Sequence, residues 1–242
     1  MTTQPALLQL RDVTRVHGSG DAEVHALRGV SLIVRPGELV AVMGPSGSGK
    51  SSLLNLAGGL DAATSGEVFI EGTPLSSLNA SGLAALRRRR IGFVFQDFNL
   101  IPSLTAAENV ALPLELDGLP VKAARAAADE ALDRVAVSEL ADRFPDQMSG
   151  GQQQRVAIAR SLVGERRLLL ADEPTGALDS ETGEGVLRVL RQRCNEGAGG
   201  LLVTHEARHA GWADRVVFLR DGLVVDTTGD AEDPNDLLVG AP

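Results

Sequence analysis

The sequence predicts an α/β fold with a mostly parallel sheet and crossover helices, an antiparallel β portion at the N-terminus and an inserted α-helical subdomain. Short apolar runs typical of strands alternate with helical patterns over most of the 242 residues. Strand signals are missing between Phe98 and Gly164, and no internal repeat is visible. We therefore expect one domain over residues 1–242, with an α/β core in 1–96 and 165–242 and a helical subdomain in 97–164.

The individual elements follow from local patterns. Strands are predicted at Leu7–Val16, Ser31–Val34, Leu39–Met43, Ile91–Phe95, Leu168–Ala171 and Leu201–Thr204. Helices are predicted at Ser51–Leu60 and at the alanine-rich segment Ala123–Val135. Val216–Arg220 and Leu223–Thr227 flank Asp221–Gly222, a dipeptide that favours a type I′ turn, so they are predicted to form a hairpin.

Composition restricts the functional class. The single cysteine, Cys194, cannot form an internal disulfide, which suits a reducing compartment. We expect no signal peptide in Met1–Leu10 and no membrane span, because no window approaches the roughly 20 apolar residues that a span needs. The net charge of -9 argues against a nucleic-acid partner. We therefore expect a soluble, cytoplasmic protein.

A glycine-rich segment matches the phosphate-binding pattern G-x-x-x-x-G-K-[ST]. Its residues are Gly44, Pro45, Ser46, Gly47, Ser48, Gly49, Lys50 and Ser51, followed by Ser52. The segment lies between a predicted strand and a predicted helix, where backbone N–H groups and the helix N-terminus bind phosphate. We expect Lys50 to reach the β- and γ-phosphates and Ser51 to bind Mg²⁺. A chance glycine-rich turn leaves unexplained why one of only two lysines occupies the required position.

Two acids follow a buried apolar run. Asp172 and Glu173 end the Leu168–Ala171 strand, which delivers them to the carboxyl edge of the sheet, where ligands bind in open α/β folds. We expect Asp172 to hold Mg²⁺ through water and Glu173 to orient or deprotonate the attacking water. The alternative is an ordinary acidic turn before Pro174, and the upstream phosphate loop favours the functional interpretation.

A second segment that suits phosphate binding identifies a family. Met148-Ser149-Gly150-Gly151-Gln152 resembles the signature sequence of the ATP-binding-cassette (ABC) family, and the rest of the chain resembles that family over its whole length. The resemblance implies a P-loop NTPase (RecA-like) core that binds ATP and Mg²⁺ and hydrolyses ATP. It also implies a homodimer that sandwiches two ATP molecules head to tail. Ser149, Gly150, Gly151 and Gln152 would then grip the nucleotide on the partner's phosphate loop.

The same resemblance assigns further site residues. Gln96 is similar to the glutamine that senses Mg²⁺ and the attacking water, Asp179 to the acid of the loop at the dimer interface, and His205 to the histidine that contacts the γ-phosphate. One position departs from the family pattern, because the chain has no tyrosine to stack on adenine. Either His17 stacks on the base instead or it is an exposed loop residue. Base selectivity, including use of GTP, is therefore open.

Several segments resemble the branch of macrolide-exporting and lipoprotein-releasing ATPases. They are Leu54–Asp61, Ile91–Leu100 and Glu108–Val110. The resemblance implies a separate integral membrane permease, export or mechanotransmission, and a peripheral location on the inner face of the plasma membrane. The alternatives are an importer or cell-division type of ABC ATPase, a non-transport ABC ATPase, and a P-loop kinase. Phe98, Leu100 and Ile101 either line a groove for the permease or pack in the core.

Overall fold

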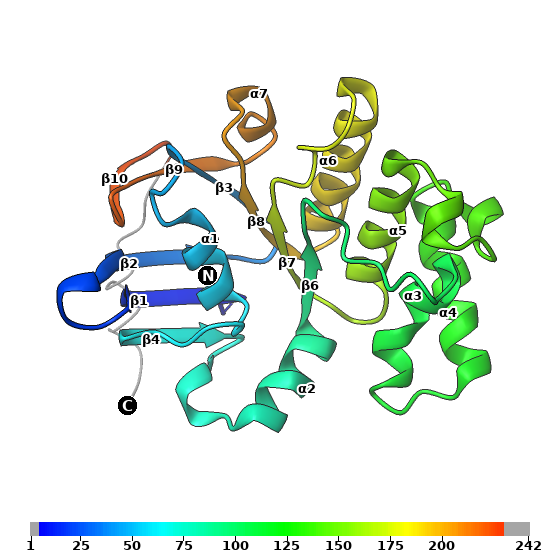
Figure 1. The fold of residues 1–242 in the computed structure, drawn as a ribbon, viewed down its shortest axis with the longest axis horizontal. Helices are drawn as coiled ribbons and strands as arrows, with labels where there is room; N and C mark the ends of the chain where they lie inside the picture. Colours follow the sequence, from blue (N-terminus) through cyan, green and yellow to red (C-terminus); the bar gives the residue numbers. More distant parts are fainter. Residues whose placement is uncertain (1–4, 230–242) are drawn as a thin grey trace.

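The α/β fold is confirmed in a computed structural model, which describes residues 5–229. The larger sheet has six strands in the order β10-β9-β3-β8-β7-β6. The strands are β3 Leu39–Met43, β6 Ile91–Val94, β7 Leu168–Asp172, β8 Gly199–Val203, β9 Arg215–Arg220 and β10 Leu223–Thr227. All neighbours from β9 to β6 pair in parallel, and only β10 is antiparallel, at one edge (Figure 1).

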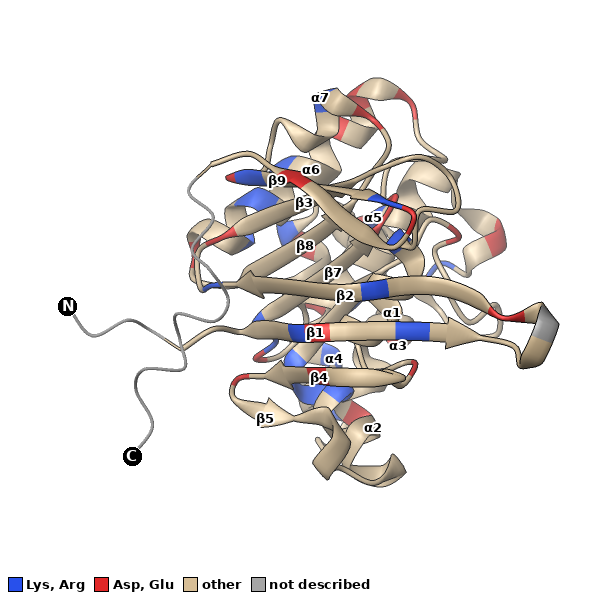
Figure 2. Ribbon diagram, turned by 90° about the vertical axis from the view of Figure 1, so that its left-hand side faces the viewer, with Lys and Arg blue, Asp and Glu red and all other residues tan. Residues whose placement is uncertain are grey.

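The predicted antiparallel β portion is a four-stranded sheet in the order β2-β1-β4-β5. Its strands are β1 Leu8–His17, β2 Val24–Val34, β4 Ser65–Ile70 and the two-residue β5 Thr73–Pro74. Figure 2 shows β2, β1 and β4 lying side by side in front of the larger sheet. The turn between β1 and β2 therefore projects from one end of the molecule, and β1 continues as far as His17.

Seven α-helices complete the described part of the chain. They are α1 Lys50–Ala57, α2 Ala80–Arg90, α3 Ala106–Glu115, α4 Val121–Arg134, α5 Gly150–Leu162, α6 Ser180–Asn195 and α7 Ala207–Ala210. Figure 1 shows α3 and α4 grouped at the right, far from the antiparallel sheet at the left. Among residues 5–229, every helix is too short or too polar to cross a membrane.

The central strands separate two hydrophobic cores. On β7, Leu168 and Leu170 join the core shared by α1 and the antiparallel sheet, whereas Leu169 and Ala171 join the core beneath α3, α4, α5 and α6. This division follows from the two-residue period of a strand, which sends successive side chains to opposite faces. Both faces of β7 are covered, so its sequence is a continuous apolar run rather than an alternating one.

Most predicted elements are confirmed, with differences at their ends. β3 and β10 have the predicted bounds, and the β9–β10 turn has φ of 50° at Asp221 and 77° at Gly222, as a type I′ turn requires. β2 begins at Val24, seven residues before the predicted start, because its first part is largely exposed and lacks a continuous apolar run. α1 ends at Ala57 because Gly59 adopts a left-handed φ of 62°.

The lone cysteine gives a prediction about chemical reactivity. Cys194 is fully buried near the end of α6, and this burial raises the pKa of its thiol to about 12. Because the thiolate is the nucleophile, we expect no reaction with a chromogenic disulfide reagent in the native state. Labelling should begin only in denaturant, at the rate of global unfolding measured by fluorescence of Trp212. Rapid labelling of the folded protein would show that α6 opens locally.

Candidate nucleotide-binding site

The phosphate-binding segment connects β3 to α1 and is shaped by close backbone approaches. A Cβ at Gly44 would lie 2.1 Å from the Leu219 carbonyl oxygen, so a side chain cannot fit there. Gly49 has φ of 104°, and a Cβ on it would lie 2.3 Å from the Ala26 carbonyl oxygen. These two glycines therefore allow the loop to press against β9 and β2. The result is a tight turn at the N-terminus of α1.

Lys50 lies inside this loop with its charge already partnered. Its Nζ donates hydrogen bonds to the carbonyl oxygens of Gly44, at 2.8 Å, and Pro45, at 2.9 Å. The β9–β10 turn supports the loop from outside, since the Gly222 N–H donates to the Ser48 carbonyl oxygen at 3.0 Å. The loop and its lysine are thus held in place by their own backbone and by the terminal hairpin.

The predicted magnesium ligands lie next to each other. Asp172 ends β7, and its carboxylate accepts a hydrogen bond from the Ser51 hydroxyl. Burial raises the pKa of Asp172, and the negative charge of Glu173 raises it further. The Ser51 hydrogen bond and the charge of Lys50 oppose that shift. Serine and carboxylate oxygens are hard ligands of the kind that Mg²⁺ prefers.

Glu173 follows in an unusual backbone conformation. Its φ is 43°, in the left-handed region that non-glycine residues rarely adopt, and its N–H donates to the Val203 carbonyl oxygen at 2.9 Å. The side-chain Oε2 lies 2.7 Å from His205 Nδ1. Strained residues of this kind cluster at functional sites. The turn thus aims Glu173 toward His205 instead of continuing the strand.

These groups surround one cavity of about 700 Å³. Its lining includes the predicted residues His17, Gly44, Pro45, Ser46, Gly47, Gly49, Lys50, Ser51, Ser52, Asp172, Glu173 and His205. Ser48 is the one member of the loop that does not line it, because its side chain is buried. The volume is typical of small-molecule sites. A single chain therefore brings most of the predicted nucleotide residues together.

Four lining residues were not predicted: Val24, His25, Ala26 and Val203. The first three begin β2, where His17 pairs with Val24 in the antiparallel register. Finding them required the start of β2, which the sequence pattern did not reveal. This register brings the exposed residues His17, Val24 and His25 together in the cavity lining.

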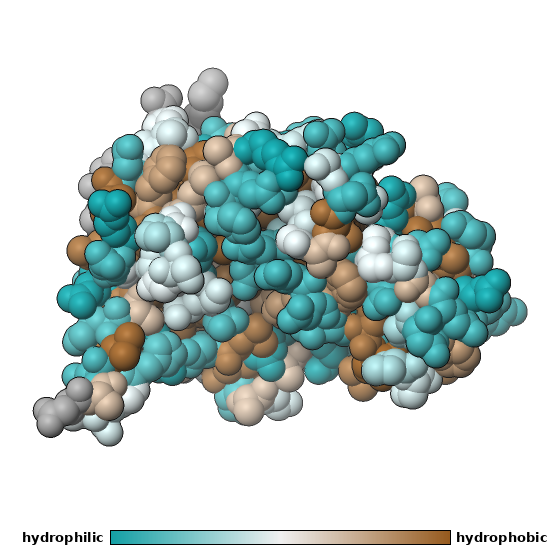
Figure 3. Space-filling model, turned by 45° about the horizontal axis from the view of Figure 1, so that its top comes forward, coloured by the Kyte–Doolittle hydropathy of each residue, from teal (hydrophilic) through white to brown (hydrophobic). Residues whose placement is uncertain are grey.

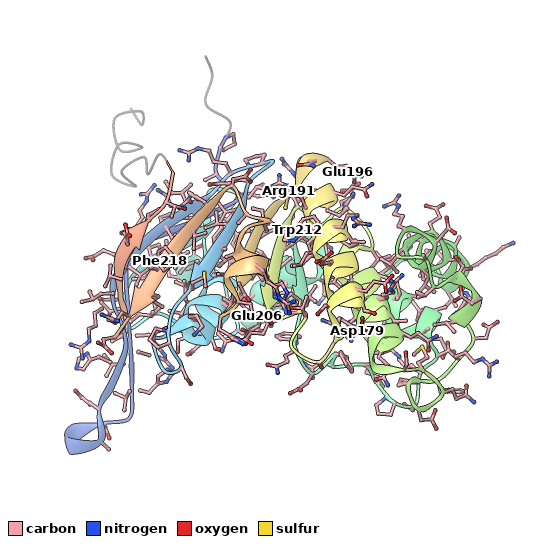
Figure 4. All side chains as sticks on the ribbon, turned by 90° about the horizontal axis from the view of Figure 1, so that it is seen from above. Asp179, Arg191, Glu196, Glu206, Trp212 and Phe218 are labelled. Atoms are coloured by element: carbon pink, nitrogen blue, oxygen red, sulfur yellow. The ribbon has the colours of Figure 1, made fainter. Side chains whose placement is uncertain are left out.

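Gln96 and Asp179 lie outside the cavity lining. The Gln96 amide packs against the loop after Glu173, because a Cβ at Gly176 would be 3.2 Å from Gln96 Nε2. Asp179 caps α6 (Figure 4), accepting from the Thr182 N–H at 3.0 Å and from its hydroxyl at 2.8 Å. These two hydrogen bonds lower the pKa of Asp179.

The signature segment is also remote from the cavity of its own chain. Ser149 caps α5 in a capping box, in which the Gln152 N–H donates to the Ser149 hydroxyl and the Ser149 N–H donates to Gln152 Oε1. Gly151 packs closely on Thr182 at the start of α6, where a Cβ would be 2.9 Å from Thr182 Cγ2. The N-terminus of α5 is therefore preformed, and it does not line the cavity that holds the phosphate loop of the same chain.

The fold and the arrangement of these segments are those of an ATP-binding cassette, and the chain belongs to the ABC transporter family. The profile of that family, described as ABC transporter, matches residues 27–176. Similar proteins include the macrolide export ATP-binding/permease protein MacB of Hyphomonas neptunium, 46% identical over 94% of this chain, and MacB of Escherichia coli K12, 46% identical over 90%. The chain spans about a third of the length of these relatives, 35% and 34% respectively.

Solved structures agree with this assignment. The dimeric structure of MJ0796, described as a bacterial ABC transporter cassette, has a TM-score of 0.84 and 44% sequence identity. A dimeric post-hydrolysis state of MJ0796 bound to ADP and Pi has a TM-score of 0.85 and 44% identity. Each comparison covers 91% of this chain and 97% of the other. The ABC ATPase fold thus extends over nearly all of the protein.

Proposed function

We propose that this cassette hydrolyses ATP as a homodimer in which each nucleotide is shared by two copies of the chain. The observation that carries the proposal is the separation of two phosphate-binding devices in one polypeptide. The cavity holds Lys50, Asp172 and Glu173, while the capped start of α5 at Ser149 contacts no part of it. In a two-fold dimer, the α5 of one copy can close the cavity of the other.

Each cavity residue has a role that fits its position. We assign phosphate binding to the loop and Lys50, and Mg²⁺ binding to Ser51 and Asp172, with Gln96 approaching once the dimer closes. Bound Mg²⁺ would neutralise charge on the phosphates. Glu173 would take a proton from the attacking water, and His205, at 2.7 Å from it, would contact the γ-phosphate. His17, an exposed residue of the cavity lining, would stack on the base.

A direct experiment tests the proposed reaction. Purified protein is incubated with magnesium-ATP and no other substrate, and free phosphate is measured over time. Release of phosphate with matching ADP supports an ATPase, and chelation of Mg²⁺ should stop it. A P-loop kinase would release phosphate only slowly without an acceptor. Absence of turnover in the folded, ATP-bound dimer would contradict the proposal.

We further propose that the cassette drives a separate integral membrane permease of the export or mechanotransmission type, because the chain is 46% identical to the macrolide export ATP-binding/permease protein MacB. A surface groove of about 360 Å³ is the proposed docking site for a segment of the permease. It is lined by Leu60, Arg87, Arg88, Ile91, Phe93, Phe95, Asn99, Leu112, Pro113, Leu116, Arg160, Ser161 and Arg166. Of the three residues suggested for such a groove, Phe98, Leu100 and Ile101, none lines it, and Leu100 packs against the core.

The groove combines apolar surface with uncompensated positive charge. Arg160 donates to the Phe98 carbonyl oxygen at 2.8 Å, and Arg166 donates to that of Arg88 at 3.0 Å. Within residues 5–229, neither guanidinium forms an ion pair with a carboxylate. Burial lowers the pKa of both guanidinium groups. The pKa of Arg166 falls to about 10, because the positive charge of Arg160 adds to the effect of burial. A permease segment with apolar and acidic side chains would complement this surface.

This docking surface gives a prediction with a matched control. Leu116 is 63% exposed in the groove, and Leu116→Glu should weaken permease binding about tenfold or more by removing apolar contact and adding a negative charge that repels acidic side chains of the partner. Val121 is 69% exposed outside the groove, so Val121→Glu should bind like the parent. Binding is measured by recovery of the permease from solubilised membranes. Equal recovery with both variants would place docking elsewhere.

The cellular arrangement follows from this pairing. The cassette would be cytoplasmic and held peripherally on the inner face of the plasma membrane by its permease. We propose that residues 97–164 act as the helical subdomain that carries α5 and one side of the permease groove, with no nucleic acid involved. Figure 3 shows a largely hydrophilic face with small, separate apolar patches. Such a surface suits a protein that contacts the membrane through a partner.

A further inference from the structure

One buried amide on α5 connects two loops of the candidate site. Gln154 has no exposed surface, and its Nε2 donates to the Pro174 carbonyl oxygen at 2.5 Å and to that of Phe95 at 3.3 Å. Its Oε1 has no partner among the described residues. A buried polar side chain is costly unless its hydrogen bonds are made, so the two donated bonds explain why an amide occupies this position.

The two acceptors belong to the loops that carry the reacting groups. Phe95 directly precedes Gln96, and Pro174 directly follows Glu173. The loops leave the same edge of the sheet, because β6 and β7 pair in parallel with Val94 opposite Ala171. They also touch each other where Gln96 packs on Gly176. The amide of Gln154 therefore spans the gap between the two loops at their origins.

The same helix begins at the signature segment. Ser149 caps α5, and Gln154 lies on its second turn, about 7.5 Å along the axis from the cap. The capping box fixes the first turn, and the buried side chains of Val156, Ile158 and Leu162 fix the rest of the helix. A displacement of the helix start would thus move Gln154 as part of one rigid element.

We infer that Gln154 is a positioning residue that couples the two nucleotide sites of the dimer. The inference rests on the proposed function, in which Ser149 grips the nucleotide of the partner copy. When α5 closes on that nucleotide, Gln154 moves with the helix and shifts the backbone at Phe95 and Pro174 through its two hydrogen bonds. This shift changes the positions of the neighbouring residues Gln96 and Glu173 in the chain's own site. Gln154 does not line the cavity, so it would act through the two loops and not on the nucleotide directly.

The test replaces the amide by a side chain of similar shape without a donor. Gln154→Met keeps the volume but leaves the two carbonyls unpaired. Gln153→Met is the matched control, because Gln153 Nε2 donates only to Met148 within the same segment. We expect kcat of Gln154→Met to fall about tenfold to a hundredfold, since small misplacements of reacting groups have effects of this size. The Hill coefficient for ATP should fall to about one, as for independent sites.

Further measurements separate positioning from misfolding. ATP binding to the isolated subunit and the circular dichroism spectrum of Gln154→Met should match those of Gln153→Met. Amide hydrogen exchange should increase in both loops, 95–99 and 174–179, for the Gln154 variant alone. If the parent hydrolyses ATP and the two variants share one kcat and one Hill coefficient, the coupling role of Gln154 is wrong and the proposed function stands. If the parent does not hydrolyse ATP, the proposed function itself fails.

Discussion

Glu173→Gln should bind ATP with unchanged affinity and hydrolyse it about 10² to 10⁴ times more slowly than the parent. The amide keeps the size of the side chain but cannot accept the proton of the attacking water. Because hydrolysis would release the closed pair, the variant should also accumulate as a dimer in ATP. Phosphate release and size-exclusion chromatography measure the two effects together.

The control for this variant is a second Glu→Gln change near the same region. Glu206 lies close in sequence to His205 but pairs with Arg208 at 2.6 Å and does not line the cavity. Glu206→Gln should therefore keep the parent's rate. If Glu173→Gln hydrolysed ATP at the parent rate, Glu173 would not be the general base. His205, whose Nδ1 lies 2.7 Å from Glu173 Oε2, would then be the next candidate for that role.

Ser149→Asp should abolish ATP-dependent dimer formation while each subunit still binds ATP. Aspartate is as good an N-cap as serine, so α5 remains folded, but its carboxylate would face the γ-phosphate held by the partner. Repulsion between like charges in a closed interface should lower hydrolysis by about 10² or more. Sedimentation of the variant in magnesium-ATP gives the oligomeric state.

Ser149→Asn separates charge from loss of the hydroxyl, because asparagine caps a helix and carries no charge. It should form the dimer and retain part of the activity. If Ser149→Asp and Ser149→Asn formed the dimer equally well, Ser149 would not lie against a phosphate. That result would contradict the proposal that two copies of the chain share each nucleotide.

The sequence predicted best those elements whose residue pattern is set by local backbone conformation or by burial within one short segment. The loop at Gly44–Ser51 needs glycine at fixed positions, and the apolar run before Asp172 is buried on both faces, so both patterns are visible without tertiary information. The Asp221–Gly222 turn is likewise specified by two residues that tolerate positive φ.

Features set by pairing between distant segments were missed. β4 has only two buried residues in its Ser65–Ile70 span, so no apolar run marks it, and the exposed start of β2 lacked a pattern. As a result, the contribution of His25 and Ala26 to the cavity was not foreseen. The role inferred for Gln154 was equally hidden, because it depends on two carbonyl groups far away in sequence.

The position of β3 in the sheet has a consequence for how the protein is made. Val40 pairs with Leu201 on one side and with Arg215 on the other, so both neighbours of the strand that leads into the phosphate loop come from the last part of the described chain. On the ribosome, a nascent chain that stops before residue 199 has no partner for either edge of β3. Nucleotide capture therefore has to wait until nearly all of the cassette has been synthesised.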